Sequence, residues 1–199
     1  MIAWAFDVDS LTHGDNNFQQ WFLNWATDKS IYLLTDKDRS EVARFLPLEF
    51  YSQAKICFYC MGNTIITYDE ITNLNHFKLT EEEYNWLSNL GPVTVKGGCV
   101  SVKCNDLTLN TINEFNNKFN RLEAFIQQGI MIVVRRGAGT GISFNLIQQL
   151  PNIHSINFVG SGVDNGGIFK AFSDKVKEFH GTVIQSGNFL ETKIKLEKL

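Results

Sequence analysis

The chain has 199 residues, of which 44% are hydrophobic and 13% aromatic, and its formal net charge is −3. This length and composition suffice for one well-buried core with a small accessory lobe. The negative charge excludes a general nucleic-acid binder or a membrane-surface binder, because either would need a basic face. The sequence has no run of ~18 apolar residues and no basic leader at its start, so we expect a cytoplasmic protein.

The first element is an apolar segment, 2–6, that leads directly into Asp7 and Asp9. Such a segment predicts a buried strand of a parallel sheet, and strands of this kind present functional residues at their carboxyl ends. The chain can bend there and bring both carboxylates to one site, as a nucleophile and a proton donor require. The alternative is a capping cluster, because Asp, Ser and Thr commonly begin helices.

Helices and strands alternate after this segment. The aromatic residues of 18–26 recur at helical spacing, which predicts a helix that packs on the core. A strand at 31–34, a helix at 39–45 and a strand at 54–59 continue the alternation. This order predicts an α/β protein with a Rossmann-like, doubly wound parallel sheet.

The pattern then changes. Thr80 precedes three glutamates and predicts the start of a helix, and 93–96 with 99–103 predicts a hairpin about two glycines. We expect a long helix over 110–128, ended by a glycine, and a strand over 130–134.

The last part of the chain returns to alternation, with helices expected at 143–150 and 167–179. Strands are expected at 153–159, 182–185 and 192–196. The core domain is therefore predicted to comprise 1–68 and 137–199, and 69–136 is predicted to be an inserted α/β cap domain.

Four cysteines leave two interpretations open. Cys57 and Cys60 have the spacing of a zinc-binding pair, whereas four residues separate Cys99 from Cys104. Their sulfurs are either zinc ligands or buried, reduced thiols, and the second pair would need a bend to bind one metal.

Several segments resemble motifs of the haloacid dehalogenase-like phosphatases. The first motif of that family runs Asp-x-Asp-Gly-Thr-Leu-Thr, and Asp-Val-Asp-Ser-Leu-Thr at 7–12 is similar to it with one residue missing. The strand and threonine at 31–39 resemble the second motif. The segments 133–141 and 159–172 resemble the third and fourth motifs of the trehalose-6-phosphate phosphatase branch. The four segments occur in the family's order, which implies the family's fold.

The resemblance also implies roles for individual residues. Asp7 matches the nucleophile that attacks phosphorus, Asp9 matches the acid/base, and Thr35 matches the hydroxyl that contacts a phosphate oxygen. The family's magnesium site would involve Asp7, Asp9 and acids of the fourth motif. Here Ser161 stands at the position of the principal acid, and Asp164 is displaced by one residue. Mg²⁺ is therefore expected if the protein is active, and weakly bound or absent if its site is degenerate.

The third motif supplies a lysine in the family, but Thr140 stands at this position. Arg136 is the expected substitute, although its guanidinium is larger and planar. Asp36 and Thr140 are further candidate substrate contacts in the core. We expect the hairpin 93–103 and the helix 110–128 of the cap to face Asp7 across a crevice, where Lys96 and Lys103 either meet a phosphate or are solvated strand lysines.

Two functions remain open. The first is a degenerate phosphatase-like site that binds a phosphorylated small molecule or a protein partner, because the lysine and a main metal ligand are lost. The second is an active magnesium-dependent phosphohydrolase on a small sugar phosphate or nucleotide, through an aspartyl-phosphate intermediate.

Overall fold

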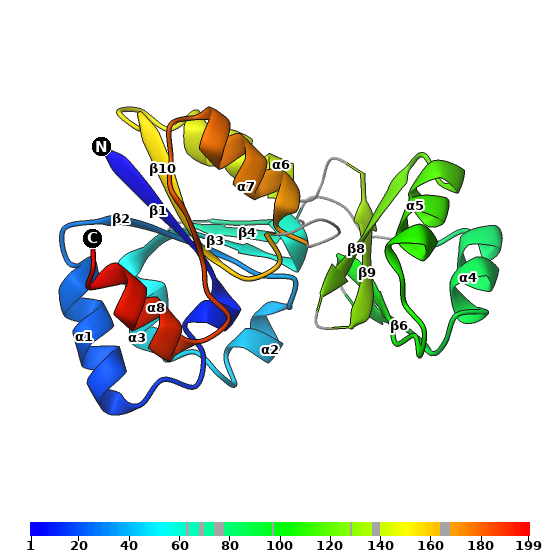
Figure 1. The fold of residues 1–199 in the computed structure, drawn as a ribbon, viewed down its shortest axis with the longest axis horizontal. Helices are drawn as coiled ribbons and strands as arrows, with labels where there is room; N and C mark the ends of the chain where they lie inside the picture. The colour runs from blue at the N-terminus through cyan, green and yellow to red at the C-terminus, as the bar shows by residue number, and fades with distance from the viewer. Residues whose placement is uncertain are drawn as a thin grey trace.

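The computed structural model describes residues 1–62, 64–67, 70–73, 78–96, 98–127, 129–136, 140–163 and 168–199. Within these ranges the side chains of Asn73, Lys96 and Thr140 lie outside the description. Figure 1 shows two α/β units side by side, each built on its own sheet.

The main unit contains a seven-stranded sheet in the order β11-β10-β1-β2-β3-β4-β5. The strands from β11 to β3 are parallel, whereas β4 and β5 are antiparallel to their neighbours. The strand bounds are β1 Ile2–Asp7, β2 Ser30–Leu34, β3 Ala54–Tyr59, β4 Thr64–Thr67, β5 Ile71–Asn73, β10 Ser155–Gly160 and β11 Val183–Gln185.

Helices cover both faces of this sheet (Figure 1). Helices α1 (Asn16–Ala26), α3 (Leu48–Gln53) and α8 (Phe189–Leu196) pack on one face, and α6 (Thr140–Gln148) and α7 (Lys170–Glu178) pack on the other. Side chains of a strand alternate between the two faces, so adjacent residues of β1 belong to different hydrophobic clusters. The predicted doubly wound α/β core is confirmed.

The insert, as we call the described residues between β5 and α6, has a four-stranded antiparallel sheet in the order β6-β7-β9-β8. Its helices lie on the side of this sheet that faces away from the main unit (Figure 1). The bounds are α4 Glu81–Ser88, β6 Val93–Lys96, β7 Cys99–Val102, α5 Leu109–Lys118, β8 Leu122–Gln127 and β9 Ile130–Arg135.

Two expected elements were wrong. The helix predicted over 110–128 ends at Lys118, and its second half is strand β8. Helical spacing continues through the apolar residues Ile112, Phe115, Phe119 and Leu122. The side chains of β8 nevertheless alternate with period two. The strand predicted at 192–196 is part of α8, which Asn188 caps. In both segments the apolar residues fit either period, so the pattern alone was ambiguous.

The sequence also missed the antiparallel pair β4 and β5. Strand β5 falls inside the range 69–136 that we expected to be the cap, yet it pairs with β4 in the main sheet. The short helix α2 (Arg39–Val42) and the 3₁₀ turns η1 (Val8–Ser10) and η2 (Cys60–Gly62) complete the fold. Among the described residues, no helix has the length and apolar character needed to span a membrane.

Candidate functional site

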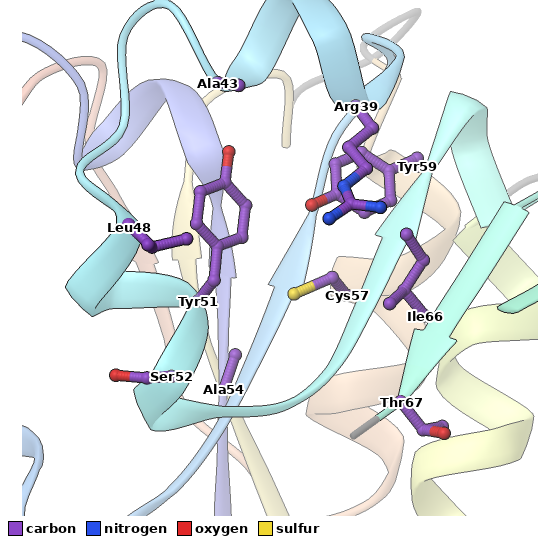
Figure 2. Close-up of a pocket in the computed structure, with 10 residues that line it drawn as sticks. All are labelled: Arg39, Ala43, Leu48, Tyr51, Ser52, Ala54, Cys57, Tyr59, Ile66 and Thr67. Atoms are coloured by element: carbon purple, nitrogen blue, oxygen red, sulfur yellow. The ribbon is translucent and has the colours of Figure 1, made fainter. Parts of the chain in front are cut away.

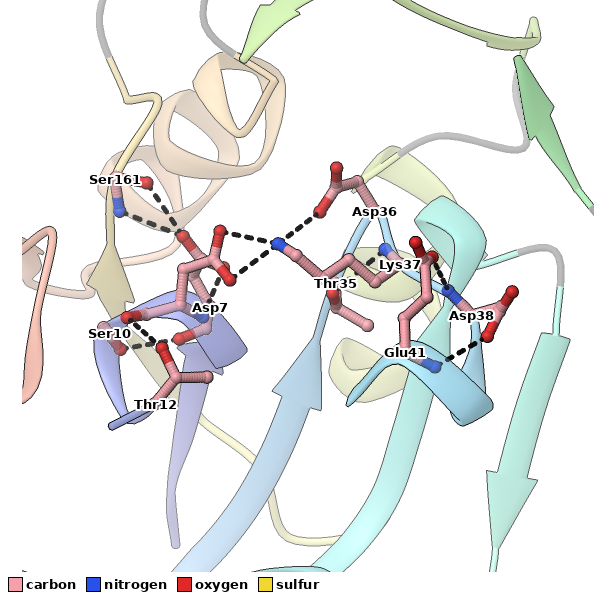
Figure 3. Close-up of polar contacts among 10 residues, drawn as sticks. Asp7, Ser10, Thr12, Thr35, Asp36, Lys37, Asp38, Glu41 and Ser161 are labelled. Atoms are coloured by element: carbon pink, nitrogen blue, oxygen red, sulfur yellow. Dashed lines mark hydrogen bonds and ion pairs between the residues drawn. The ribbon is translucent and has the colours of Figure 1, made fainter. Parts of the chain in front are cut away.

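The candidate site lies where β10, β1 and β2 end side by side at the carboxyl edge of the sheet (Figure 3). Asp7 ends β1 and pairs in register with Leu34 at the end of β2. Thr35 follows β2 directly, and Ser161 follows β10. Parallel neighbours end at one edge, so residues from three distant segments meet there.

The 3₁₀ turn η1 holds Asp7 and Asp9 next to each other. The backbone N–H of Asp9 donates to Oδ1 of Asp7 at 3.1 Å, and Oγ of Ser10 donates to the Asp7 carbonyl at 2.6 Å. A Cβ atom at Gly160 would lie 2.5 Å from the Cβ of Asp7, so only glycine fits beside it. Asp7 therefore caps the turn, as the capping alternative proposed, and also faces the shared strand edge.

Asp7 is buried, and the hydrogen bonds that its carboxylate accepts from described residues come from neutral groups. Its exposed fraction is 1%, and Oδ2 accepts hydrogen bonds from the backbone N–H of Ser161 at 3.3 Å and from its Oγ at 2.9 Å. Burial, aided by the charges of Asp9 and Asp36, raises the pKa of Asp7 to about 7, although these hydrogen bonds oppose the shift. The carboxyl of Asp7 therefore titrates near neutral pH.

Lys37 supplies a positive charge that the sequence analysis did not identify. Its Nζ lies 2.7 and 2.8 Å from the two carboxylate oxygens of Asp9, and 3.4 Å from Oδ1 of Asp36. Burial lowers the pKa of Lys37, but Asp36 and Asp9 overcome this effect, so the net shift is upward. Ser161 and Lys37 approach the carboxylates from opposite sides (Figure 3).

The remaining carboxylate of the site is Asp36. Burial raises its pKa, while the charge of Lys37 acts in the opposite direction. One lysine therefore serves two carboxylates, and a third, Asp7, has no cation in contact among the described residues. The site carries an excess of negative charge whenever Asp7 is ionised.

An open cavity of about 250 Å³ adjoins the Asp9 side of the site. It gives a small molecule access to the ion pair of Asp9 and Lys37. Its lining residues are Asp9, Thr12, His13, Lys37, Phe45 and Gly187.

The structure places the other predicted core residues as follows. Thr35 is buried, and its Oγ1 accepts a hydrogen bond from the backbone N–H of Lys37 at 3.1 Å.

The guanidinium of Arg136 donates to the carbonyls of Leu122 at 3.1 Å and Asn116 at 2.8 Å, within the insert. Among the described residues, the cation beside the acids is therefore Lys37 rather than the expected Arg136. The side chain of Thr140 and the whole of Asp164 lie outside the described residues.

The insert sheet, rather than its helices, faces the site. The Sγ of Cys99 donates to the Asp36 carbonyl at 3.4 Å, at the hairpin end where Lys96 pairs with Cys99. Helix α5, which we expected to face Asp7, packs on the opposite side of the insert sheet. Lys103 is exposed and follows β7 at the end opposite to Cys99. The side chain of Lys96 lies outside the description.

The cysteines fall into different environments. Cys60 and Cys99 interact with each other, and this contact lowers the pKa of Cys60. Cys57 instead lies in a second cavity of about 240 Å³, between Tyr51 and Tyr59 (Figure 2). Burial raises the pKa of Cys57 to about 12, so its thiol is protonated at neutral pH.

The described residues do not fit a magnesium ion. Mg²⁺ needs near-octahedral oxygen ligands, typically carboxylates and water. Asp7 already accepts hydrogen bonds on both carboxylate oxygens, and both oxygens of Asp9 contact Lys37. Within the described ranges, no three His, Cys, Asp or Glu side chains are placed to hold a metal.

Comparison with known proteins supports the fold. No protein-family model and no curated protein matches the sequence. Among solved structures, the IMP-nucleotidase of Plasmodium falciparum is 12% identical, with a TM-score of 0.66 over 99% of this chain and 67% of that chain. The subclass IIB sugar phosphatase BT4131 is 12% identical, with a TM-score of 0.65 over 94% of each chain.

The trehalose-6-phosphate phosphatase of Aspergillus fumigatus is also similar. It is 11% identical, with a TM-score of 0.57 over 92% of this chain and 82% of that chain. The chain therefore has the fold of the haloacid dehalogenase superfamily phosphatases, as its motifs implied.

Proposed function

We propose that this chain, which shares the fold of haloacid dehalogenase superfamily phosphatases, binds the phosphate group of a small molecule at the Asp7 site and hydrolyses it slowly or not at all. The observation that carries this proposal is the pair of hydrogen bonds from Ser161 to Oδ2 of Asp7. They place a neutral donor where the similar motif has a metal-binding acid.

Charge determines when such a site can accept an anion. With Asp7 ionised, the described part of the site has three carboxylates and a single ammonium group, and a phosphate would be repelled. When Asp7 takes up a proton near neutral pH, one negative charge is lost and the carboxyl gains an O–H donor. Phosphate binding is therefore expected to favour protonated Asp7.

Two further groups complete the proposed contacts. The hydroxyl of Thr35 lies at the end of β2, one position from Asp36, and can donate to a phosphate oxygen. The ammonium of Lys37 already serves Asp9 and Asp36, so it offsets their charge and adds a direct contact only if it moves. Cytoplasmic location and the absence of nucleic-acid and membrane partners remain predictions from the sequence.

The experiment is a calorimetric titration of the full chain with inorganic phosphate and glucose 6-phosphate, with magnesium and with a chelator. A parallel assay measures phosphate release from a panel of sugar phosphates and nucleotides. We expect binding that does not depend on magnesium, and little release. Ser161→Asp restores an acid next to Asp7 and is expected to add magnesium binding, whereas Ser52→Ala, an exposed serine, should change nothing.

A second candidate function is an active phosphohydrolase. Lys37 favours it, because its ammonium brings to the acids the positive charge that the third-motif lysine supplies in similar phosphatases. In that reaction an Asp7 oxygen bonds to phosphorus, the bond from phosphorus to the ester oxygen breaks, and Asp9 gives the leaving oxygen its proton. Water then attacks the aspartyl-phosphate and returns a proton to Asp9. This function requires ionised Asp7, and Asp9 would have to leave Lys37 to carry a proton. Rapid, magnesium-dependent release that Asp7→Asn abolishes would establish it and overturn the first proposal.

A further inference from the structure

We propose that the cavity of about 240 Å³ between α2, α3, β3 and β4 binds a small monocarboxylate with an apolar body, such as an aromatic or branched aliphatic acid. This cavity shares no lining residue with the cavity beside Asp9. Carboxylate binding there is a function beyond phosphate binding at Asp7 and does not depend on it.

The cavity is a hollow between one helix and two strands of the main sheet (Figure 2). Cys57 and Tyr59 of β3 and Ile66 of β4 belong to the hydrophobic cluster on the α3 face of this sheet. Tyr51 of α3 lies across from them. Leu48 also lines the cavity, yet it is 78% exposed, so its apolar side chain is available to a ligand.

The size and walls of the cavity suit a ring or a branched chain. A protein cavity of about 150 Å³ accommodates benzene, so about 240 Å³ has room for such a ring and for a carboxylate as well. Apolar side chains contribute much of the lining, and removing the ring from water against them would favour binding. These side chains are Ala43, Leu48, Ala54 and Ile66.

Arg39 makes the lining of the cavity cationic. It is the first residue of α2, and its guanidinium points into the cavity beside Tyr59 and Cys57 (Figure 2). Within the described ranges it forms no ion pair with a carboxylate. Burial raises the pKa of Tyr51 and of Cys57 to about 12 and also raises the pKa of Tyr59, so these groups are neutral at neutral pH. One positive charge in a neutral lining matches one carboxylate better than a doubly charged phosphate, and a guanidinium can donate to both carboxylate oxygens.

The hydroxyl of Tyr51 supplies a second donor. Its Oη is buried, and no described group is placed to complete a hydrogen bond with it. Burial dominates its pKa, while Tyr59 and Arg39 lie close enough to oppose the shift. Buried hydroxyls nearly always have a partner, because an unpaired one loses its hydration without compensation. A carboxylate held by Arg39 would supply the missing acceptor.

The test is a calorimetric titration of the full chain at neutral pH with sodium benzoate, with benzamide as its uncharged analogue and with acetate as a carboxylate that lacks the ring. We expect benzoate to bind at least about tenfold more tightly than either analogue. Arg39→Gln and Tyr51→Phe should each weaken benzoate about tenfold, because each removes a donor to the carboxylate. Arg44→Gln, at another exposed arginine, is the matched control and should leave the affinity unchanged.

Further measurements identify where benzoate binds. Its affinity should be the same with and without inorganic phosphate, whereas displacement by phosphate would place it at the Asp7 site and overturn the proposal. Failure of the wild type to bind benzoate, or equal weakening by Arg39→Gln and Arg44→Gln, would also overturn it. The melting temperature of Tyr51→Phe should stay the same or rise, because the variant lacks an unpaired hydroxyl. A lower melting temperature with unchanged benzoate affinity would show that this hydroxyl is structural and contradict its assigned role. Failure of phosphate to bind would end the proposed function alone.

Discussion

The two carboxylates at the end of β1 lie two residues apart but in contrasting surroundings. Asp9 contacts the ammonium of Lys37 through both its oxygens, whereas Asp7 receives hydrogen bonds from neutral groups of Asp9 and Ser161. The Asp9 half of the site therefore carries its own counter-charge. The Asp7 half lacks such a counter-charge, so its carboxyl is neutral only when it holds a proton.

This contrast identifies Asp7 as the carboxyl whose protonation state a bound anion would change. A buried charge with no counter-ion is costly, so a carboxyl in such a place holds its proton. The pKa of Asp7 is raised to about 7, mainly by burial. A substitution at Lys37 changes the surroundings of Asp9, and substitutions at Asp7 or Ser161 change those of Asp7.

The largest effect is expected from Lys37→Met, which removes the cation from the Asp9 half. Breaking a buried ion pair by removing one partner costs about 3–5 kcal/mol, and the partial exposure of Lys37 reduces this to about 2–3 kcal/mol. Denaturant unfolding at about pH 8 measures the loss. The loss should shrink as the pH falls, because the pKa of Asp36 is raised by burial and a protonated Asp36 no longer needs the cation. Lys55→Met, at an exposed lysine of β3, is the control, and equal losses in both variants would contradict the role of Lys37.

Asp7→Asn is expected to stabilise the protein by about 2 kcal/mol at about pH 8. The sign of this effect follows from the raised pKa of Asp7. Native Asp7 holds its proton better than unfolded Asp7, so the free energy of unfolding decreases as pH rises from 3.8 to about 7. The amide of asparagine also faces the donors of Ser161, which keeps the gain below the full value of the shift. Unfolding across this pH range should show a smaller slope in the variant. No change in slope, or the same change in Asp28→Asn, would show that Asp7 is not the titrating group.

Ser161→Ala is expected to have a smaller effect. It removes the Oγ donor from Asp7 but leaves the backbone donor, which costs about 1 kcal/mol when Asp7 is ionised. The loss should appear at about pH 8 and vanish at about pH 5, because a neutral carboxyl needs the donor less. A loss that is equal at both pH values would mean that Ser161 acts through packing alone.

The sequence predicted the main fold because its elements carry distinct periods. The apolar strands at 2–6 and 54–59 and the aromatic spacing of 18–26 each fit a single structure. The segments 110–128 and 192–196 fit two periods, and packing against neighbouring elements decided between them. Local pattern does not contain that information.

The site was predictable in part for a similar reason. Asp7 ends a strand, and Asp9, Thr35 and Ser161 come shortly after strands, so the rule that parallel strands end at one edge brings them together. Lys37 also follows β2, and its position two residues after Thr35 was the available signal.

The most direct test of this account is the pH dependence of anion binding. Inorganic sulfate remains a dianion between about pH 5 and pH 9, so a change in its affinity over this range reports the protein's own titration. We predict that wild-type affinity falls as pH rises through about 7, because Asp7 becomes charged, and that Asp7→Asn removes this step. An affinity that stays constant or rises through the same range in the wild type would contradict the claim that protonated Asp7 forms the anion site.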